Sequence, residues 1–163
     1  MSNVTLSETR SSTLSGGPSD CAVARSFDFQ LQIGNRPGCC PGIDASDIDC
    51  NQGSRITWVG ASEQNTRGPI PSTIGELTEL VHLWAFGNRM PGELPKGIGN
   101  AKNLTHLILY ENQLSNSLPD TLVNLKKLEV LRLDNNKFTG PVPLLPNPRY
   151  VSMDSGHLLT WIG

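Results

Sequence analysis

The chain has 163 residues, a formal net charge of −2 and an isoelectric point near 5.9, a length that suits one domain with flanking segments. The charge balance excludes the basic surface of nucleic-acid-binding proteins, and no apolar run approaches the roughly 18 residues of a membrane span. A charged fraction of 17%, with 16 Gly and 12 Pro, favours a loop-rich architecture over a helical one.

Residues 1–20 are polar and rich in Ser, Thr and Gly, and we expect a flexible N-terminal segment. They lack the apolar core of a secretory signal peptide. Taken alone, that absence favours the cytosol. The cysteines that follow indicate another compartment.

All four cysteines lie in residues 21–55, ahead of any repeat: Cys21, Cys39, Cys40 and Cys50. Two disulfides that staple a small N-terminal cap are the favoured interpretation, and free thiols or a metal site are the alternatives. The metal site fits least, because the adjacent Cys39 and Cys40 lack C-x-x-C spacing. Since disulfides persist in oxidising compartments, the cysteines predict an extracellular or cell-surface protein.

A 24-residue repeat occupies residues 56–146 in about four units. The segment LVHLWAFGNRM at 80–90 recurs as LTHLILYENQL at 104–114 and as LEVLRLDNNKF at 128–138. A second phrase follows each unit: GPIP at 68–71, GELP at 92–95, NSLP at 116–119 and GPVP at 140–143. A period of this length indicates a solenoid, and solenoids usually present a binding surface.

Alternate residues of each short strand must point into the core, because successive side chains of a strand face opposite ways. These inward residues are Ile56, Val59, Ala61, Leu80, Leu83, Ala85, Leu104, Leu107, Leu109, Leu128, Leu131 and Leu133. The return segments supply Ile70, Ile74, Leu77, Leu94, Ile98, Ala101, Leu118, Leu122 and Leu125. We expect a structural ladder of turn-satisfying amides from Asn88, Asn112 and Asn136, with Gln64 in the first unit.

These blocks resemble the plant-type extracellular leucine-rich repeat, L-x-x-L-x-L-x-x-N-x-L-x-G-x-I-P-x-x-L-G-x-L, over residues 56–146. The resemblance implies an α/β solenoid: a right-handed superhelix with a short-stranded parallel sheet on its concave face. The convex returns would be 3-10 helical or irregular. Similar proteins include receptor-like ectodomains, polygalacturonase inhibitors and related secreted proteins of fungi and protists.

Residues 21–55 resemble the N-terminal cap of the same family. That resemblance implies the disulfides Cys21–Cys39 and Cys40–Cys50, and hence a disulfide-stapled cap. The chain departs from the family where Pro-Gly-Ile at 41–43 replaces the usual Trp after the Cys pair. The capping helix would also have to be short.

The 24-residue register assigns outward-facing side chains to columns across the concave sheet, where neighbouring strands lie about 4.8 Å apart. One column reads Trp58, His82, His106 and Val130; the next reads Gly60, Trp84, Ile108 and Arg132; the third reads Ser62, Phe86, Tyr110 and Asp134. Contiguous outward aromatics often mark an interaction site, although they could also cover the sheet or meet the tails. We therefore predict a ligand-binding face made of Trp58, His82, Trp84, Phe86, His106, Ile108, Tyr110, Glu111, Arg132 and Asp134.

His82 and His106 could in principle share a metal ion or respond to acidic pH. The next residue of their column is Val130, which cannot be a third ligand, so ordinary aromatic contact is favoured and no metal site is predicted. No nucleophile–base–acid motif or phosphate-binding loop is present, and Glu111 and Asp134 form only a loose acidic pair. We expect no catalytic residues, no cofactor and no enzymatic activity.

The repeat pattern fails after Pro143, where Val151 and Met153 could form one last irregular strand. Residues 147–163 are expected either to fold back as an improvised cap or to leave an open end that meets another chain. The favoured function is recognition of a protein, peptide or carbohydrate ligand on the concave face. Self-association through the open C-terminal end into oligomers or filaments is the alternative. Inhibition of a wall-degrading enzyme is a third possibility, which rests on the resemblance.

Two sequons for N-glycosylation begin at Asn3 and Asn103. Asn3 lies in the polar N-terminal segment and Asn103 at the entrance of a strand. They support secretion only mildly, because a chain of this length is expected to contain about one by chance.

Overall fold

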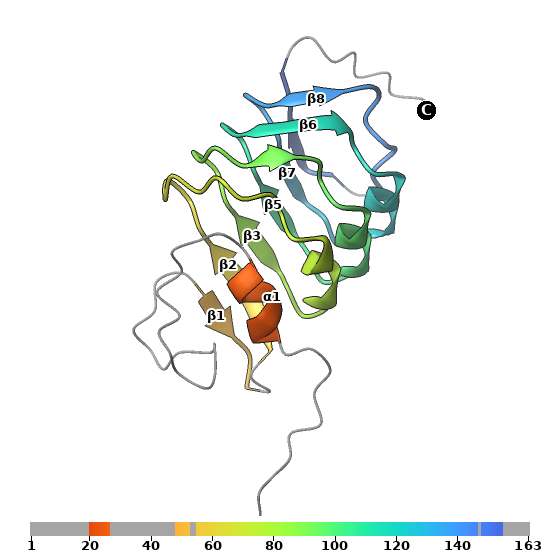
Figure 1. Ribbon diagram of the computed structural model, residues 1–163. Helices are drawn as coiled ribbons and strands as arrows, with labels where there is room; N and C mark the ends of the chain where they lie inside the picture. Colours follow the sequence, from red (N-terminus) through yellow and green to blue (C-terminus); the bar gives the residue numbers. More distant parts are fainter. Residues whose placement is uncertain (1–19, 27–47, 53–54, 147, 155–163) are drawn as a thin grey trace, which may run out of the picture.

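The computed structural model describes residues 20–26, 48–52, 55–146 and 148–154 of the chain. They form a stack of coils with a sheet along one side and short 3-10 helices along the other (Figure 1). The predicted leucine-rich repeat solenoid is therefore confirmed. The helices are α1 (Asp20–Ser26), η1 (Ser72–Glu76), η2 (Lys96–Asn100) and η3 (Asp120–Asn124).

The main sheet has six strands in the order β1-β2-β3-β5-β7-β9. Their bounds are β1 Ile48–Cys50, β2 Ile56–Gly60, β3 His82–Trp84, β5 His106–Ile108, β7 Val130–Arg132 and β9 Tyr150–Ser152. From β2 onward the strands are parallel, and residues 24 apart pair from β2 to β7. Only β1 runs antiparallel, against β2.

Stacking of successive repeats buries one continuous core. All twelve inward strand residues anticipated from the period are at most 1% exposed, and all nine residues of the returns are at most 5% exposed. Side chains on both sides of each coil therefore contact their equivalents one repeat away. Because no repeat can bury its apolar face alone, stability depends on the whole stack.

The return segments become 3-10 helices because a proline at each start fixes φ, at −60° for Pro71 and −62° for Pro95. The helices pack so closely that a Cβ on Gly75 would lie 2.0 Å from the Gly97 carbonyl oxygen. A Cβ on Gly99 would likewise lie 2.5 Å from the Thr121 carbonyl oxygen. The equivalent residue of η3 is Val123, which is tolerated because no further 3-10 helix follows among the described residues.

A second sheet, which the period did not suggest, lies on the side of the turns. It contains β4 (Pro91–Gly92), β6 (Gln113–Ser117) and β8 (Lys137–Thr139), which are parallel and adjacent in that order. Gly92 and Gly140 have positive φ values of 89° and 80°, and Asn116 occupies the intermediate repeat at 67°. Asparagine tolerates this left-handed conformation better than other side chains, which explains why it replaces glycine there.

The asparagine amides join consecutive turns. Asn112 accepts the Met90 backbone N–H through Oδ1 at 3.1 Å and donates through Nδ2 to the Ala85 and Leu109 carbonyls at 2.9 and 3.1 Å. Asn88 makes the equivalent bonds to the first repeat, and Asn136 makes them to the third. Each amide therefore satisfies buried backbone groups of its own turn and of the preceding one.

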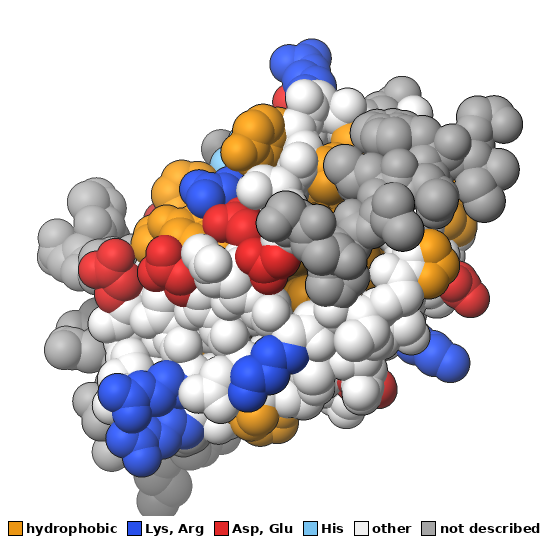
Figure 2. All heavy atoms as spheres, turned by 90° about the horizontal axis from the view of Figure 1, so that it is seen from above, with side chains coloured by type: hydrophobic (Ala, Val, Ile, Leu, Met, Phe, Trp, Pro, Cys, Tyr) orange, Lys and Arg blue, Asp and Glu red, His pale blue; other side chains and the backbone are white. Residues whose placement is uncertain are grey.

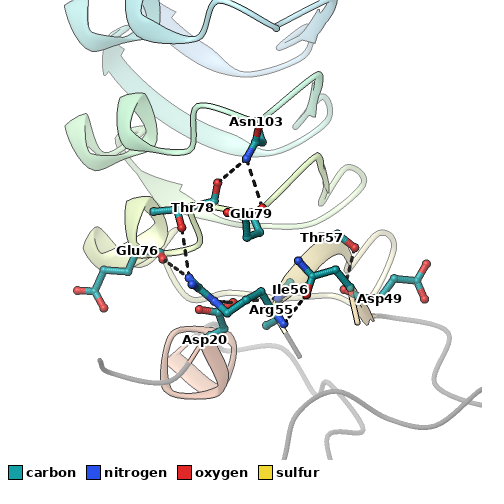
Figure 3. Close-up of polar contacts among 10 residues, drawn as sticks. Asp20, Asp49, Arg55, Ile56, Thr57, Glu76, Thr78, Glu79 and Asn103 are labelled. Atoms are coloured by element: carbon teal, nitrogen blue, oxygen red, sulfur yellow. Dashed lines mark hydrogen bonds and ion pairs between the residues drawn. The ribbon is translucent and has the colours of Figure 1, made fainter. Parts of the chain in front are cut away.

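At the N-terminal end, the buried carboxylate of Asp20 attaches α1 to β2 (Figure 3). Its Oδ2 accepts the Ile56 backbone N–H at 2.8 Å and the Arg55 Nε–H at 2.9 Å. The bond to Asp20 raises the pKa of Arg55, which stays charged and also donates to the Glu76 carbonyl and the Thr78 hydroxyl. One carboxylate thus couples the helix to both β2 and the loop before β3.

The described cysteines of the cap, Cys21 and Cys50, are both disulfide-bonded. The pairings Cys21–Cys39 and Cys40–Cys50 stay predictions, because Cys39 and Cys40 lie outside the described residues. The observed capping helix α1 has seven residues, as short as the sequence requires.

The C-terminal end is closed by β9 and by Asp154. In the middle repeats, the turn N–H groups of Glu111 and Asn112 donate to carbonyls one repeat later. No later turn follows the last one among the described residues, and Asp154 accepts the Asn135 and Asn136 N–H groups instead, at 2.7 and 3.1 Å. Viewed from above, this end shows acidic and basic side chains next to hydrophobic ones (Figure 2).

Substituting Asp154→Ala should lower the free energy of unfolding by about 1–2 kcal/mol, because two backbone donors lose a charged acceptor. Urea unfolding followed by circular dichroism measures this. Asp120→Ala is the matched control, since it removes an exposed carboxylate with no hydrogen bond in the structure. Equal unfolding midpoints for the two variants would show that Asp154 does not close the stack.

Candidate functional site

The outward side chains of the main sheet form the predicted columns. Trp58 lies opposite His82, His82 opposite His106, and His106 opposite Val130, while β9 adds Tyr150 to this column. The neighbouring column continues from Arg132 to Ser152. Apart from Gly60, which is buried, the described outward residues are half-buried or exposed, so this concave face is a solvent-facing surface built on a rigid sheet.

A first group of rings covers β2, β3 and β5. The Trp58 and Trp84 ring centroids are 5.9 Å apart and nearly perpendicular, and His82 lies 5.9 Å from Trp84 and 4.8 Å from His106. Gly60 permits this packing, since a Cβ there would lie 2.1 Å from the Trp58 ring. The rings are half-buried rather than fully exposed because they cover one another.

A second group lies further along the face. Phe86 and Tyr110 stack with their ring planes 6° apart and their centroids 4.6 Å apart. Arg132 places its guanidinium carbon 3.9 Å from the Tyr110 ring centroid and pairs with Asp134 at 3.2 Å. Burial lowers the pKa of Arg132, but the hydrogen bond and charge of Asp134 outweigh that and raise it overall. This end of the face therefore contains a compensated cation.

The turn after each strand of the repeats contains a residue in the left-handed conformation, with φ between 55° and 66°: Glu63, Gly87, Glu111 and Asn135. The carboxylates of Glu63 and Glu111 are consequently held out at the border of the face, where both residues are exposed. Their backbone N–H groups donate to Phe86 and Asp134 carbonyls, which fixes the position of each turn.

An open hollow of about 520 Å³ lies where β1, β2 and β3 meet. It is lined by Asp49, Thr57, Trp58, Val81, His82 and Trp84. Asp49 is directly opposite Trp58 across the antiparallel pair, so both side chains face outward. Three of the predicted residues, Trp58, His82 and Trp84, therefore share one concavity.

The two column histidines differ in their surroundings. Burial, and secondarily the charge of His106, lower the pKa of His82. His106 Nδ1 is 2.8 Å from the Thr105 hydroxyl, which donates its proton to the Val81 carbonyl at 3.1 Å. The Thr105 hydroxyl therefore lies between the His106 ring and the Val81 carbonyl, and whether Nδ1 of His106 donates or accepts depends on the tautomer.

Sequence reasoning missed four residues of this face: Asp49, Thr57, Val81 and Tyr150. Thr57 and Val81 come one residue before Trp58 and His82, the members of the first column. Tyr150 lies after Pro143, where the 24-residue spacing ends. Asp49 lies on the antiparallel β1, outside the repeat altogether. Only alternation in residues 48–50, with Ile48 and Cys50 flanking an acidic residue, could have indicated it.

Asn103 lies on the flank of the stack. Its Nδ2 donates to the Thr78 carbonyl at 3.1 Å and to Glu79 Oε2 at 3.5 Å (Figure 3), and its Oδ1 accepts Lys127 Nζ at 2.6 Å. A glycan on Nδ2 would replace one of those two donor hydrogens. The other sequon, at Asn3, lies outside the described residues.

Within the described residues, no group of three or more His, Cys, Asp or Glu side chains could hold a metal ion. In the same part of the chain, no helix is both long and apolar enough to cross a membrane. Several polar atoms of the face are buried without hydrogen-bond partners, among them Trp84 Nε1, Arg132 Nε and Asp134 Oδ1.

Comparisons with known proteins agree with the fold. Residues 103–125 and 127–147 match the family model Leucine Rich Repeat. The LRR ectodomain of the receptor kinase SOBIR1 from Arabidopsis thaliana is similar, with a TM-score of 0.60 and 21% identity over 84% of this chain and 96% of that chain. No curated protein matches the chain.

Two further structures are similar, and one of them contains a bound peptide hormone. The Arabidopsis receptor kinase HAESA, in complex with the peptide hormone IDA and the co-receptor SERK1, has a TM-score of 0.59 and 32% identity over 61% of this chain. The PEPR1–AtPEP1 structure has a TM-score of 0.54 and 28% identity over 61% of this chain. The present chain covers only 17% and 16% of those chains, respectively.

The protein is thus a leucine-rich repeat solenoid. Its repeats are similar to those of plant leucine-rich repeat receptors, which confirms the resemblance seen in the sequence.

His82 should titrate below the ordinary histidine pKa of 6.5, because burial and His106 disfavour its charged form. As pH falls below about 7, the unfolded chain takes up the proton before His82 does in the folded chain, so the free energy of unfolding should decline. Histidine Cε1–H chemical shifts followed by NMR give the midpoint. In His106→Ala the midpoint should rise; an unchanged or lower midpoint would show that His106 does not repel the proton.

Proposed function

We propose that this chain is a non-enzymatic extracellular recognition module that binds a peptide or an extended protein segment along its concave face. The observation that carries the proposal is the continuous half-buried aromatic surface from Trp58 to Tyr110, built on a rigid parallel sheet. Aromatic anchors that are already ordered lose little conformational entropy on binding.

The HAESA structure, which contains the peptide hormone IDA, supports this class of ligand over a carbohydrate. An extended peptide also matches a face whose columns run across several strands at a regular spacing. The extracellular setting is supported by the same ectodomain neighbours and by the disulfide-bonded Cys21 and Cys50.

End-to-end self-association is less well supported than recognition. The donors of the last turn that another repeat would satisfy, the Asn135 and Asn136 N–H groups, already bond to Asp154. The exposed Leu144 and Tyr150, at 63% and 52%, are the features that favour association. Light scattering at high protein concentration distinguishes recognition from self-association, because a protein that stays monomeric at that concentration contradicts assembly.

Selection of a displayed library of random dodecapeptides on the immobilised chain should enrich binders that lose affinity for a Trp84→Ala/Tyr110→Ala double variant. Removing both rings should weaken binding at least roughly 100-fold, as expected for two central anchors. The melting temperature should stay nearly unchanged, because neither ring contributes to the core.

Lys102→Ala, an exposed change next to η2, is the control and should leave binding intact. The proposal fails if no peptide is enriched, or if enriched peptides bind the double variant as well as the original chain. A large drop in melting temperature would instead assign the rings a structural role, which single Trp84→Phe and Tyr110→Phe changes can test separately.

A further inference from the structure

The second ring group shows how this face holds a cation. The Arg132 guanidinium lies over the Tyr110 ring at 3.9 Å and is neutralised by Asp134 at 3.2 Å. An aromatic face and a carboxylate together stabilise a positive charge, the ring through its quadrupole and the carboxylate through its charge. All three components, ring, carboxylate and guanidinium, come from the chain itself.

At the opposite end of the face, a ring and a carboxylate lie together, and the described residues supply no cation to them. The hollow of about 520 Å³ contains the indoles of Trp58 and Trp84 and the carboxylate of Asp49. Asp49 is exposed, and its carboxylate has no ion pair or hydrogen bond among the described residues. Within that part of the chain no Lys or Arg lines the hollow.

The local charges favour a cation from outside. The neighbouring His82 has a lowered pKa and is therefore neutral near pH 7, so it adds no repulsion. The border carboxylates Glu63 and Glu111 also lack ion-pair partners among the described residues, while Arg132 is compensated by Asp134. The described part of the concave face is therefore net negative.

We propose that the hollow lined by Asp49, Trp58 and Trp84 binds the cationic side chain of an arginine or lysine in a peptide ligand. This deepens the proposed function and rests on it for the nature of the ligand. Arginine fits better than lysine, because its planar guanidinium can stack on an indole while pairing with a carboxylate, as Arg132 does on Tyr110. The hollow is open to solvent, so a side chain can enter it without rearrangement of the sheet.

Small probes test the site without a known ligand: acetyl-arginine amide, acetyl-lysine amide and the neutral isostere acetyl-citrulline amide. Each is titrated into the full chain while the indole N–H signals are followed by NMR. We expect saturable shifts of Trp58 and Trp84 with acetyl-arginine amide at about millimolar concentration. Acetyl-citrulline amide should bind at least roughly 10-fold more weakly, because it lacks the charge.

Asp49→Asn should weaken the binding of acetyl-arginine amide at least roughly five-fold and leave the binding of acetyl-citrulline amide unaffected. Glu93→Gln, which removes an exposed carboxylate outside the hollow, is the matched control and should change neither. The cation site is refuted if citrulline binds as well as arginine, or if Asp49→Asn has no effect.

The outcomes also separate this inference from the proposed function. Enriched peptides that depend on Trp84 and Tyr110, together with no arginine preference in the hollow, would keep peptide recognition and remove the cation site. Saturable arginine binding with no enriched peptide would keep the cation site and remove peptide recognition.

Discussion

The asparagine amide in each turn is the interaction on which the stack depends. A turn leaves backbone groups that no strand pairing can satisfy, and burying them unpaired would cost more than the fold can recover. Asn112 solves this by accepting from Met90 in the turn before it and by donating to Ala85 and Leu109. Because each amide needs the backbone of the preceding turn, the array has a direction and its two ends are chemically different.

Each end is closed by one carboxylate. Asp20 accepts the backbone donor that begins β2, and Asp154 accepts the two donors of the last turn. The first turn has Gln64 instead of asparagine, and its Oε1 is buried without a partner, as expected where the described residues include no earlier turn to bond. A carboxylate can end the stack, because it accepts several N–H groups and adds no backbone donors of its own. A further repeat would add new unpaired N–H groups.

The period predicted the core because burial follows directly from it: every inward and return residue repeats in register, and each is buried. It did not predict β1, which lies outside the repeat, or the second sheet, whose strands lie within the repeats and pair Pro91 with Gln113 and Ser115 with Lys137. The last irregular strand expected around Val151 and Met153 is β9, which contains Val151 but ends at Ser152. One residue type in the sequence does distinguish the last repeat from the others. Val123 stands where Gly75 and Gly99 occur, and a side chain is tolerated there only where no 3-10 helix packs against it.

The columns of the face were likewise readable from the register, but the shape of the face was not. Whether a ring stands out or lies on its neighbour depends on space that the sequence does not show, such as the gap that Gly60 leaves under Trp58. In the structure the rings are half-buried because each ring packs against the next one. The hollow escaped sequence reasoning because Asp49, on the non-repeating β1, forms part of its wall.

The two ends of the concave face differ in charge. Arg132 and Asp134 neutralise each other near the last repeat, whereas Asp49 near the cap has no cationic partner among the described residues. Between them lies His82, whose pKa is lowered by burial and by the charge of His106, so His82 is unprotonated near neutral pH. A peptide with one basic residue would find the unoccupied ring and carboxylate of the proposed site with that residue toward the cap. In the reversed orientation its charge would reach the Tyr110 ring, which Arg132 already covers, so the proposed site favours one orientation.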